Sequence, residues 1–379
     1  MPRSYYTPAD RRHETAYLVG IRHARTSRHR AKADLAELTQ LAVAAELDVS
    51  GSVMAPVGRI DPAWFVGKGK VDQINREAEA QDAQVVVFDE TLSPAQARNL
   101  EEKLNRKVID RGNLVLDIFA RRARTREAIT QVELAQLEYL LPRLTGLWAH
   151  FSRQDGGVGT KGPGETQLEV DRRLTRTRIA HLKKDLARIE RSREVQRTRR
   201  KKNVRVCALV GYTNAGKSTL FNRLTQADVA AEDRMFSSLD AKSKKVYLED
   251  GTGGNERQAI LVDTVGFVSK LPPQLVASFR STLEELRFAD LLLGVLDLAH
   301  PDAATHVEEV LRVISGLGAD GIPRLWVMNK ADLVDSERVA EMAGVLEGDP
   351  YLACSASLGT GVDALARAIR DRLNPRNQF

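Results

Sequence analysis

The stretch GYTNAGKS at residues 211–218 constrains the fold of this chain more than any other feature. It follows an apolar run at 204–210 that predicts a buried strand, and it leads into 218–224, which has the pattern of a helix start. A strand, a glycine-cornered turn and a helix in this order direct backbone N–H groups and a helix N-terminus at a bound phosphate. We therefore expect an α/β domain built around a phosphate-binding loop.

Each residue type in this loop has a chemical use. Gly211 and Gly216 let the backbone wrap closely around an anion, and Lys217 places a cation near the β- and γ-phosphates of a nucleotide. The Ser218 hydroxyl is suited to ligate Mg²⁺. A glycine-rich turn before a helix is the alternative interpretation, and the loop alone does not exclude it.

Three later sequence motifs favour a nucleotide-binding site over a simple glycine-rich turn. DTVG (263–266), NKAD (329–332) and SAS (355–357) each follow a short apolar run with the pattern of a buried strand. At such a strand end, Asp263 can hold Mg²⁺ through water and Gly266 can donate its N–H to the γ-phosphate. Asp332 can accept both N–H groups of a guanine edge, which disfavours adenine by at least about 1–3 kcal/mol. The order of the boxes predicts a GTP-hydrolysing switch domain.

The predicted catalytic residues are Lys217, Asp263, Gly266 and Asn214. Asn214 is also a candidate ligand for K⁺, which would supply charge beside the phosphates. Phe267 stands where many small GTPases have a glutamine that orients water, so we expect slow intrinsic hydrolysis that depends on a partner. The predicted nucleotide contacts outside the first switch are Gly211, Tyr212, Thr213, Asn214, Ala215, Gly216, Lys217, Ser218, Thr219, Asp263, Thr264, Val265, Gly266, Asn329, Lys330, Ala331, Asp332, Ser355, Ala356 and Ser357.

The charge of the chain is unevenly placed. Residues 171–203 hold 14 Lys and Arg against 4 acidic residues, and residues 1–30 hold 7 Arg against 2, although the whole chain is only +6. A segment this basic indicates a polyanionic partner, most simply nucleic acid. A solvated helical linker without a partner is the alternative.

Two leucine-rich stripes predict a helical hairpin within residues 126–203. Ile179, Leu182, Leu186 and Ile189 recur at helical spacing, and so do Leu134, Leu137, Leu141 and Leu144, where Pro142 should kink or end the helix. The connecting stretch 156–169 has five glycines and one proline, and we expect it to have no regular structure. It is either a disordered tether or a functional loop; a contact with RNA is favoured over a second nucleotide site.

Residues 15–125 alternate short apolar runs with helical stretches. Strands are expected at 17–20, 51–55, 85–89 and 107–110, and helices at 32–47, 70–80 and 94–105. The last of these helices should be capped by Ser93. This pattern predicts a small parallel α/β sheet, and we interpret Asp89, Glu90 and Asp110 as ordinary acids at strand ends. The predicted domains are a basic tail (1–14), an N-terminal α/β domain (15–125), the hairpin region (126–203) and a GTP-binding domain (204–379).

Composition indicates a cytoplasmic protein. Both cysteines, Cys207 and Cys354, fall in apolar strands and are expected to be core thiols, in keeping with a reducing compartment. No segment approaches 18 apolar residues, and the Arg-rich start has no apolar signal core, so we expect neither export nor membrane insertion. The seven histidines show no spacing typical of metal ligands.

Several longer motifs make the chain resemble the HflX family of translation-associated GTPases, in the Obg-HflX group. The motifs are FVGKGKVDQI, DETLSPAQARNLE, KVIDRGNLVLDIFARRARTREA, QVELAQLEYLLPRL, GGVGTKGPGETQLEVDRR, GYTNAGKSTLFN and DTVGFVSKLPPQLVASFRSTLEE. The resemblance extends from about residue 15 to the C-terminus. It implies an N-terminal parallel α/β domain with a helical hairpin, followed by a P-loop GTPase α/β domain of the Ras-like type. It also implies binding to the large ribosomal subunit and rRNA, and dissociation of stalled or idle ribosomes.

The resemblance further implies a first switch at FSSLDAK (236–242), where the family pattern is FATLDPT. Ser238 then stands where a threonine normally ligates Mg²⁺, so the implied metal ligands are Ser218 and Ser238. The implied nucleotide contacts of this switch are Phe236, Ser237, Ser238, Leu239 and Asp240.

Together these features predict a GTPase with Mg²⁺ as its cofactor, monomeric when free, which binds the large ribosomal subunit through 126–203 and leaves it after GTP hydrolysis. The alternative is a GTP-regulated adaptor whose basic hairpin binds an acidic protein or another RNA. An RNA-remodelling NTPase is disfavoured because NKAD indicates guanine and no helicase elements follow.

Overall fold

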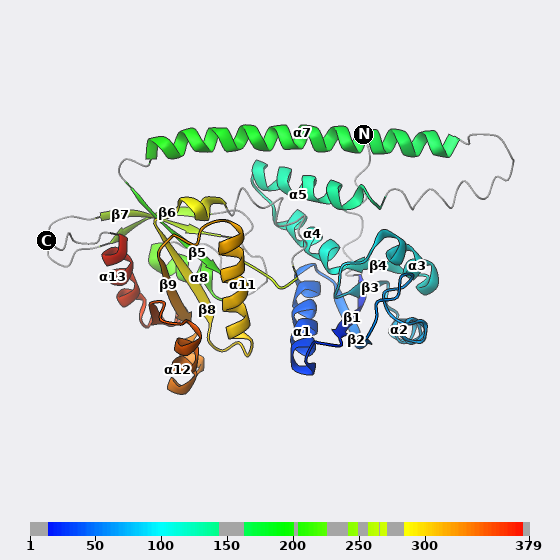
Figure 1. The fold of residues 1–379 in the computed structure, drawn as a ribbon, viewed down its shortest axis with the longest axis horizontal. Coiled ribbons are helices and arrows are strands. Elements are labelled where there is room, and N and C mark those ends of the chain that lie inside the picture. Colours follow the sequence, from blue (N-terminus) through cyan, green and yellow to red (C-terminus); the bar gives the residue numbers. More distant parts are fainter. Residues whose placement is uncertain are drawn as a thin grey trace. The chain divides into compact units, whose positions relative to one another are not determined.

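The computed structural model describes residues 14–143, 163–200, 204–225, 242–248, 257–264, 266–270 and 284–373. The contacts divide the chain into two compact units (Figure 1). The first contains residues 14–118, with the short segments 142–143 and 163–168. The second contains the rest of the described residues. The domain boundaries predicted at residues 15, 126 and 204 stay predictions.

The first unit is built on a four-stranded, all-parallel sheet in the order β2-β1-β3-β4. Its elements in chain order are β1 (Thr15–His23), α1 (Arg28–Ala44), β2 (Asp48–Val57), α2 (Lys68–Ala80), β3 (Val85–Phe88), α3 (Pro94–Leu104) and β4 (Lys107–Asp110). All four residues of β3 are buried, as expected for a central strand covered on both faces. The predicted small parallel α/β sheet is confirmed, with β1 and β2 longer than expected.

Helix α3 begins where the sequence predicts it. Ser93 caps it: the Gln96 N–H donates to Ser93 Oγ over 3.2 Å, and the Ser93 N–H donates to Gln96 Oε1 over 2.9 Å. This reciprocal capping box satisfies two backbone donors that the helix itself cannot. Pro94 occupies the first turn, where its missing N–H costs nothing.

Helix α4 (Arg111–Arg122) follows β4 directly and was not predicted. Its apolar residues Leu114, Val115, Leu116, Ile118 and Phe119 are all buried. Leu114, Val115, Ile118 and Phe119 recur at spacings of three and four, and Asn113, Asp117 and Ala120, which are not buried, lie on the opposite side of the helix. The amphipathic signal for this helix was therefore present in the sequence.

Helices α5 (Arg126–Leu140) and α7 (Pro163–Arg200) correspond to the predicted hairpin (Figure 1). Helix α5 ends before Pro142, as predicted. Two ion pairs join the helices: Arg178 holds both carboxylate oxygens of Glu133 at 2.7 and 2.8 Å, and Lys183 Nζ lies 2.8 Å from Glu138. On α7, Leu182 is buried and the rest of its predicted stripe is partly buried.

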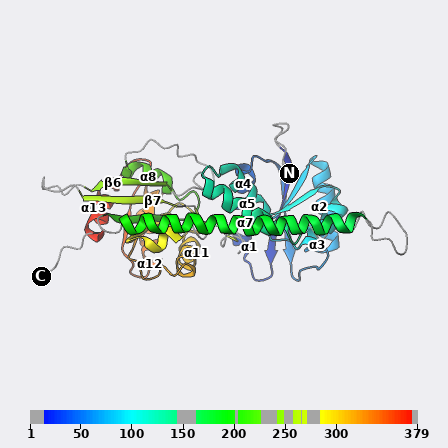
Figure 2. The ribbon, with the colours of Figure 1, turned by 90° about the horizontal axis from the view of Figure 1, so that it is seen from above.

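The expectation that 156–169 has no regular structure is wrong for its second half. Helix α7 starts at Pro163 and continues without a break for 38 residues (Figure 2). Proline is tolerated in the first turn of a helix, and the residues that follow Gly164 are mostly good helix formers. Residues 156–162 lie outside the part of the chain that the structure describes.

In the second unit, a six-stranded sheet runs in the order β10-β9-β8-β5-β7-β6, and only β6 is antiparallel to its neighbour. Its strands are β5 (Arg205–Gly211), β6 (Lys242–Leu248), β7 (Arg257–Asp263), β8 (Leu291–Asp297), β9 (Arg324–Asn329) and β10 (Tyr351–Ala353). Its α-helices are α8 (Lys217–Thr225), α11 (Ala303–Gly316), α12 (Ser336–Val345) and α13 (Val362–Leu373), with 3₁₀ turns η2 (Glu284–Phe288) and η3 (Ala331–Leu333). Apolar clusters cover both faces of this sheet. The predicted P-loop α/β fold is confirmed.

Cys207 and Cys354 are free thiols, and both are buried in one of the two apolar clusters of this sheet. Burial raises the pKa of both thiols, that of Cys354 to about 11. Among the described helices, none is both long and apolar enough to cross a membrane.

Candidate functional site

The four sequence boxes meet at the carboxyl edge of the six-stranded sheet. The phosphate-binding loop follows β5, DTVG begins at the end of β7, NKAD begins at the end of β9, and SAS follows β10. Parallel strands end at the same edge, so residues up to 146 positions apart in sequence come together there. This edge is the candidate site.

Two glycines of the loop are required by close packing. A Cβ on Gly211 would lie 2.3 Å from the Val295 carbonyl oxygen, and one on Gly216 would lie 2.1 Å from Asn329 Nδ2. Gly216 also has a φ of 90°, which side chains rarely adopt. Asn214, at the exposed tip of the loop, has a φ of 62°. The loop therefore keeps its backbone close to the neighbouring strands.

Lys217 lies buried beneath this loop. Its Nζ donates to the carbonyl oxygens of Gly211 at 3.1 Å and Tyr212 at 2.6 Å. Burial lowers the pKa of the ammonium to about 8, and the nearby Asp263 carboxylate partly opposes that shift. A Cβ on Gly266 would lie 2.9 Å from Lys217 Nζ, so Gly266 brings its backbone directly against the lysine.

Ser218 and Asp263 form the polar centre of the site. Ser218 Oγ donates to Asp263 Oδ2 over 2.8 Å, and Asp263 is completely buried. A hydroxyl and a carboxylate held this close together are the oxygen donors that Mg²⁺ prefers, so the residues fit this cation. Thr264 is equally buried, and its hydroxyl donates to the Leu209 carbonyl over 2.6 Å. The Thr264 side chain therefore fastens β7 to β5.

Asn329 links two of the boxes. Its Nδ2 donates to the Ala215 carbonyl over 2.8 Å, and its Oδ1 accepts the Ala356 N–H over 2.9 Å. The Asn329 amide thus holds the phosphate-binding loop and the SAS loop in a fixed relation. Asp332, by contrast, is exposed at the edge of the site.

The SAS loop is organised by the buried Ser355. Its Oγ accepts the Leu358 N–H over 3.2 Å and lies 3.1 Å from Ser357 Oγ. Arg223 of α8 adds a second clamp, because its Nε donates to the Ala356 carbonyl over 3.1 Å and its Nη2 to the Ser357 carbonyl over 2.6 Å. No sequence signal marks Arg223.

Asp297 is a second residue that the sequence analysis missed. It ends β8, and its Oδ2 lies 2.7 Å from Lys330 Nζ of NKAD. The signal was present, because an acid at the end of a buried apolar run is the same pattern that identified Asp263.

Phe267 pairs with the phosphate-binding loop through its backbone. Its N–H donates to the Gly211 carbonyl over 3.1 Å, and its carbonyl accepts the Thr213 N–H over 2.7 Å. Only 4% of Phe267 is exposed, and its side chain lies in the apolar cluster on one face of the sheet.

Comparison with known proteins identifies the family. Three family models match: "GTP-binding GTPase N-terminal" at residues 32–120, "GTP-binding GTPase Middle Region" at 122–200 and "50S ribosome-binding GTPase" at 206–330. The GTPase HflX of Caldanaerobacter subterraneus subsp. tengcongensis is 50% identical over 302 residues, which cover 79% of this chain and 69% of the relative. That of Escherichia coli K12 is 44% identical over 346 residues, which cover 90% and 79%.

The chain belongs to the HflX family of GTPases. It is therefore a GTP hydrolase, as predicted. Among solved structures, a GTP-binding protein from Sulfolobus solfataricus in complex with GDP is 25% identical with a TM-score of 0.50, covering 95% of this chain and 98% of that one.

Six predicted site residues of this HflX-family chain lie outside the described residues: Phe236, Ser237, Ser238, Leu239, Asp240 and Val265. The remaining predicted residues all lie in the loops or first turns at the carboxyl edge described above.

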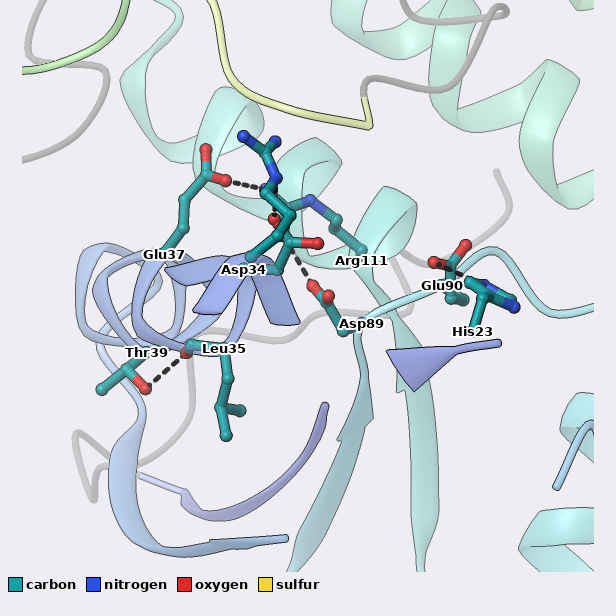
Figure 3. A network of polar contacts seen from close by, with 9 residues as sticks. His23, Asp34, Leu35, Glu37, Thr39, Asp89, Glu90 and Arg111 are labelled. Atoms are coloured by element: carbon teal, nitrogen blue, oxygen red, sulfur yellow. Dashed lines mark hydrogen bonds and ion pairs between the residues drawn. The ribbon is translucent and has the colours of Figure 1, made fainter. Parts of the chain in front are cut away.

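The acids at the strand ends of the first unit are occupied by structural contacts (Figure 3). The fully buried Asp89 pairs with Arg111 at 2.6 Å, and Arg111 pairs with Glu37 at 2.8 Å. Glu90 lies 3.2 Å from His23. Asp110 accepts the Leu92 and Asn113 N–H groups and pairs with Arg143, which agrees with the interpretation of these acids as structural.

Proposed function

We propose that this GTPase binds the large ribosomal subunit, dissociates stalled or idle ribosomes, and uses GTP hydrolysis to control its release. The match of residues 206–330 to the 50S ribosome-binding GTPase model supports the partner. The observation that carries the proposal is the cationic face of α7, which is what binding to rRNA phosphates requires.

This cationic face consists of the exposed basic residues Arg173, Arg176, Lys184, Arg188 and Arg191. At 100° per residue, they lie on the side of the helix opposite the apolar stripe through Leu182. Arg178 and Lys183, at the border, bind carboxylates of α5 instead. The hairpin thus directs its apolar side inward and a row of cations outward along about 27 Å of helix.

For the chemistry, we assign catalytic roles to Lys217, Asp263, Gly266 and Asn214. Lys217 would neutralise phosphate charge, and the Gly266 N–H would bind the γ-phosphate, in line with its position against that lysine. Ser218 and, through water, Asp263 would hold Mg²⁺, with Ser238 as the second hydroxyl ligand. When bound, Mg²⁺ supplies the positive charge that offsets the β- and γ-phosphate oxygens. Asn214 is the proposed K⁺ ligand, and its exposed position leaves it accessible.

The predicted nucleotide contacts at 211–219, 236–240, 263–266, 329–332 and 355–357 belong to the same proposal. GTP binding would favour the ribosome-bound state through the two switch segments, and hydrolysis would permit departure. Equal hydrolysis rates in sodium and potassium buffers would rule out the role of K⁺.

A charge-reversal variant tests the partner. Arg173→Glu combined with Lys184→Glu should weaken binding to purified large subunits at least tenfold with a non-hydrolysable GTP analogue, and should leave GDP affinity unchanged. The matched control is Arg312→Glu with Arg367→Glu, which makes the same charge change at exposed positions of α11 and α13. Equal subunit binding by the two double variants would reject the cationic face as the interface.

The nature of the partner is tested separately. Binding to subunits should weaken steeply with salt, because each phosphate contact releases counterions. The co-purified complex should also be lost on RNase treatment. An RNase-resistant complex with an acidic protein would instead support the adaptor alternative.

A further inference from the structure

Strand β8 ends in an ion pair with the NKAD turn. Asp297 Oδ2 lies 2.7 Å from Lys330 Nζ, with side-chain exposures of 15% and 28%. The two residues belong to neighbouring strands, since β8 and β9 are paired with Asp297 opposite Asn329. The ion pair therefore joins the strand beside the phosphate-binding loop to the turn that carries Asp332.

Both ends of this pair are held by the backbone around them. Asp297 Oδ1 accepts the Ala299 N–H over 3.0 Å, and the Leu298 N–H donates to the Asn329 carbonyl over 3.0 Å. The Asp297 carboxylate is thus held in place by hydrogen bonds to the backbone of its own turn.

Lys330 itself has an unusual backbone conformation. Its φ is 60° and its ψ is 33°, in the left-handed region, which is unfavourable for a residue with a side chain. The following Ala331 N–H donates to the Cys354 carbonyl over 3.1 Å, so the turn is tied to β10. A strained residue with an anchored ammonium group indicates a conformation that the surroundings maintain.

We propose that Asp297 is a positioning residue for guanine binding, because it holds the Lys330 side chain in one conformation before the nucleotide arrives. The inference rests on the assignment of residues 329–332 to the base pocket. A free lysine has four rotatable side-chain bonds, and immobilising it on binding costs affinity. With its ammonium anchored on Asp297, Lys330 presents its alkyl chain as a preformed wall of the pocket.

The proposed role of Asp297 concerns binding of the guanine base and not of the phosphates. GDP and GTP should therefore lose affinity equally when the ion pair is removed, and kcat should stay the same. A role in phosphate binding or in the switch would instead change the ratio of the GTP and GDP affinities.

The test is the Asp297→Asn variant, with affinity and dissociation rate measured for fluorescent GDP and a fluorescent non-hydrolysable GTP analogue. We expect both affinities to fall about two- to fivefold through faster dissociation, as suits a partly exposed ion pair with a preorganising role. KM for GTP should rise by a similar factor while kcat changes less than twofold.

Lys330→Met provides a second variant, because it keeps the alkyl chain and removes only the anchor. It should lose as much affinity as Asp297→Asn, and the double variant should lose no more than either single one. Losses that multiply in the double variant, or an affinity within 1.5-fold of the wild type for both single variants, would overturn the proposal.

Asp290→Asn is the matched control. Asp290 stands just before β8, at the opposite edge of the sheet, and pairs with Arg205 at 2.6 Å. It should leave nucleotide affinity unchanged. Asp332→Asn, measured in the same series, distinguishes a failure of the base-pocket assignment from a failure of the positioning role of Asp297. If it keeps full GDP affinity, the base-pocket assignment fails; if it loses GDP affinity while Asp297→Asn does not, only the positioning role fails.

Discussion

The Tyr212 ring of the phosphate-binding loop lies stacked on the imidazole of His306, with 3.7 Å between ring centroids and 10° between the ring planes. His306 belongs to α11 and is buried, and the His300 ring lies tilted against it with 4.3 Å between ring centroids. The loop that carries the site is thus supported from the side by a helix whose sequence carries no nucleotide-binding motif.

Replacing His306 with alanine should weaken nucleotide binding. A stacked aromatic pair contributes about 0.5–1.5 kcal/mol beyond its buried area, so we expect GDP to dissociate about two- to tenfold faster. His306→Phe preserves the stack and should stay near the wild-type rate. Dissociation of fluorescent GDP measures both variants, and equal rates in His306→Ala and the wild type would show that the loop does not need this support.

Replacing Phe267 with glutamine should not restore fast intrinsic hydrolysis. The side chain at this position is buried in the apolar cluster, because the backbone on both sides is paired with the phosphate-binding loop. A glutamine there would bury an amide and lose apolar contacts, which we expect to cost about 3 kcal/mol of unfolding free energy. Urea unfolding and single-turnover GTP hydrolysis test this; faster hydrolysis at unchanged stability would contradict it.

Nucleotide affinity should decline above about pH 8. Burial lowers the pKa of the Lys217 ammonium from 10.5 to about 8, so the free protein carries this charge below that pH and loses it above. Phosphate binding favours the charged form of Lys217. Above about pH 8 the lysine must therefore take up a proton when the nucleotide binds. The affinity for GDP should fall by up to about tenfold for each pH unit above 8.

Guanosine is the control for this pH series, because it has the same base and no phosphate. Its affinity should follow any titration of the base alone between pH 7 and 9. A parallel decline for GDP and guanosine would remove Lys217 as the cause.

Replacing Arg111 with methionine should destabilise the first unit. Its guanidinium, 2% exposed, neutralises the buried Asp89 and the nearby Glu37, and its removal leaves a buried carboxylate without its ion-pair partner (Figure 3). Breaking one side of a buried ion pair costs about 3–5 kcal/mol. Denaturant unfolding should show this loss, whereas GDP affinity should stay unchanged because the proposed nucleotide contacts belong to the other unit. Loss of GDP binding at a denaturant concentration where the variant is still folded would show that GDP binding depends on this ion pair of the first unit.

Two residues of the candidate site could be found from the sequence because each ends an apolar run. Asp263 and Asn329 both follow runs of apolar residues that could only be buried strands, and the structure puts both at the carboxyl edge of the sheet. Helix α4 was missed although Leu114, Val115 and Ile118 recur at helical spacing, because β4 leads directly into it with no loop between them to mark its start.

Residues that act through a contact with a residue distant in the sequence could not be found in this way. Arg223 binds carbonyl groups more than 130 positions away, and Tyr212 stacks on a residue of a helix three strands further along the chain. The amino-acid sequence alone determined the fold class and the position of the phosphate-binding loop, and it predicted the nucleotide contacts, because these depend on local spacing. Only the tertiary structure decided which side chains hold those groups in place, among them Asp297 on Lys330, because such contacts depend on which strands become neighbours in the sheet.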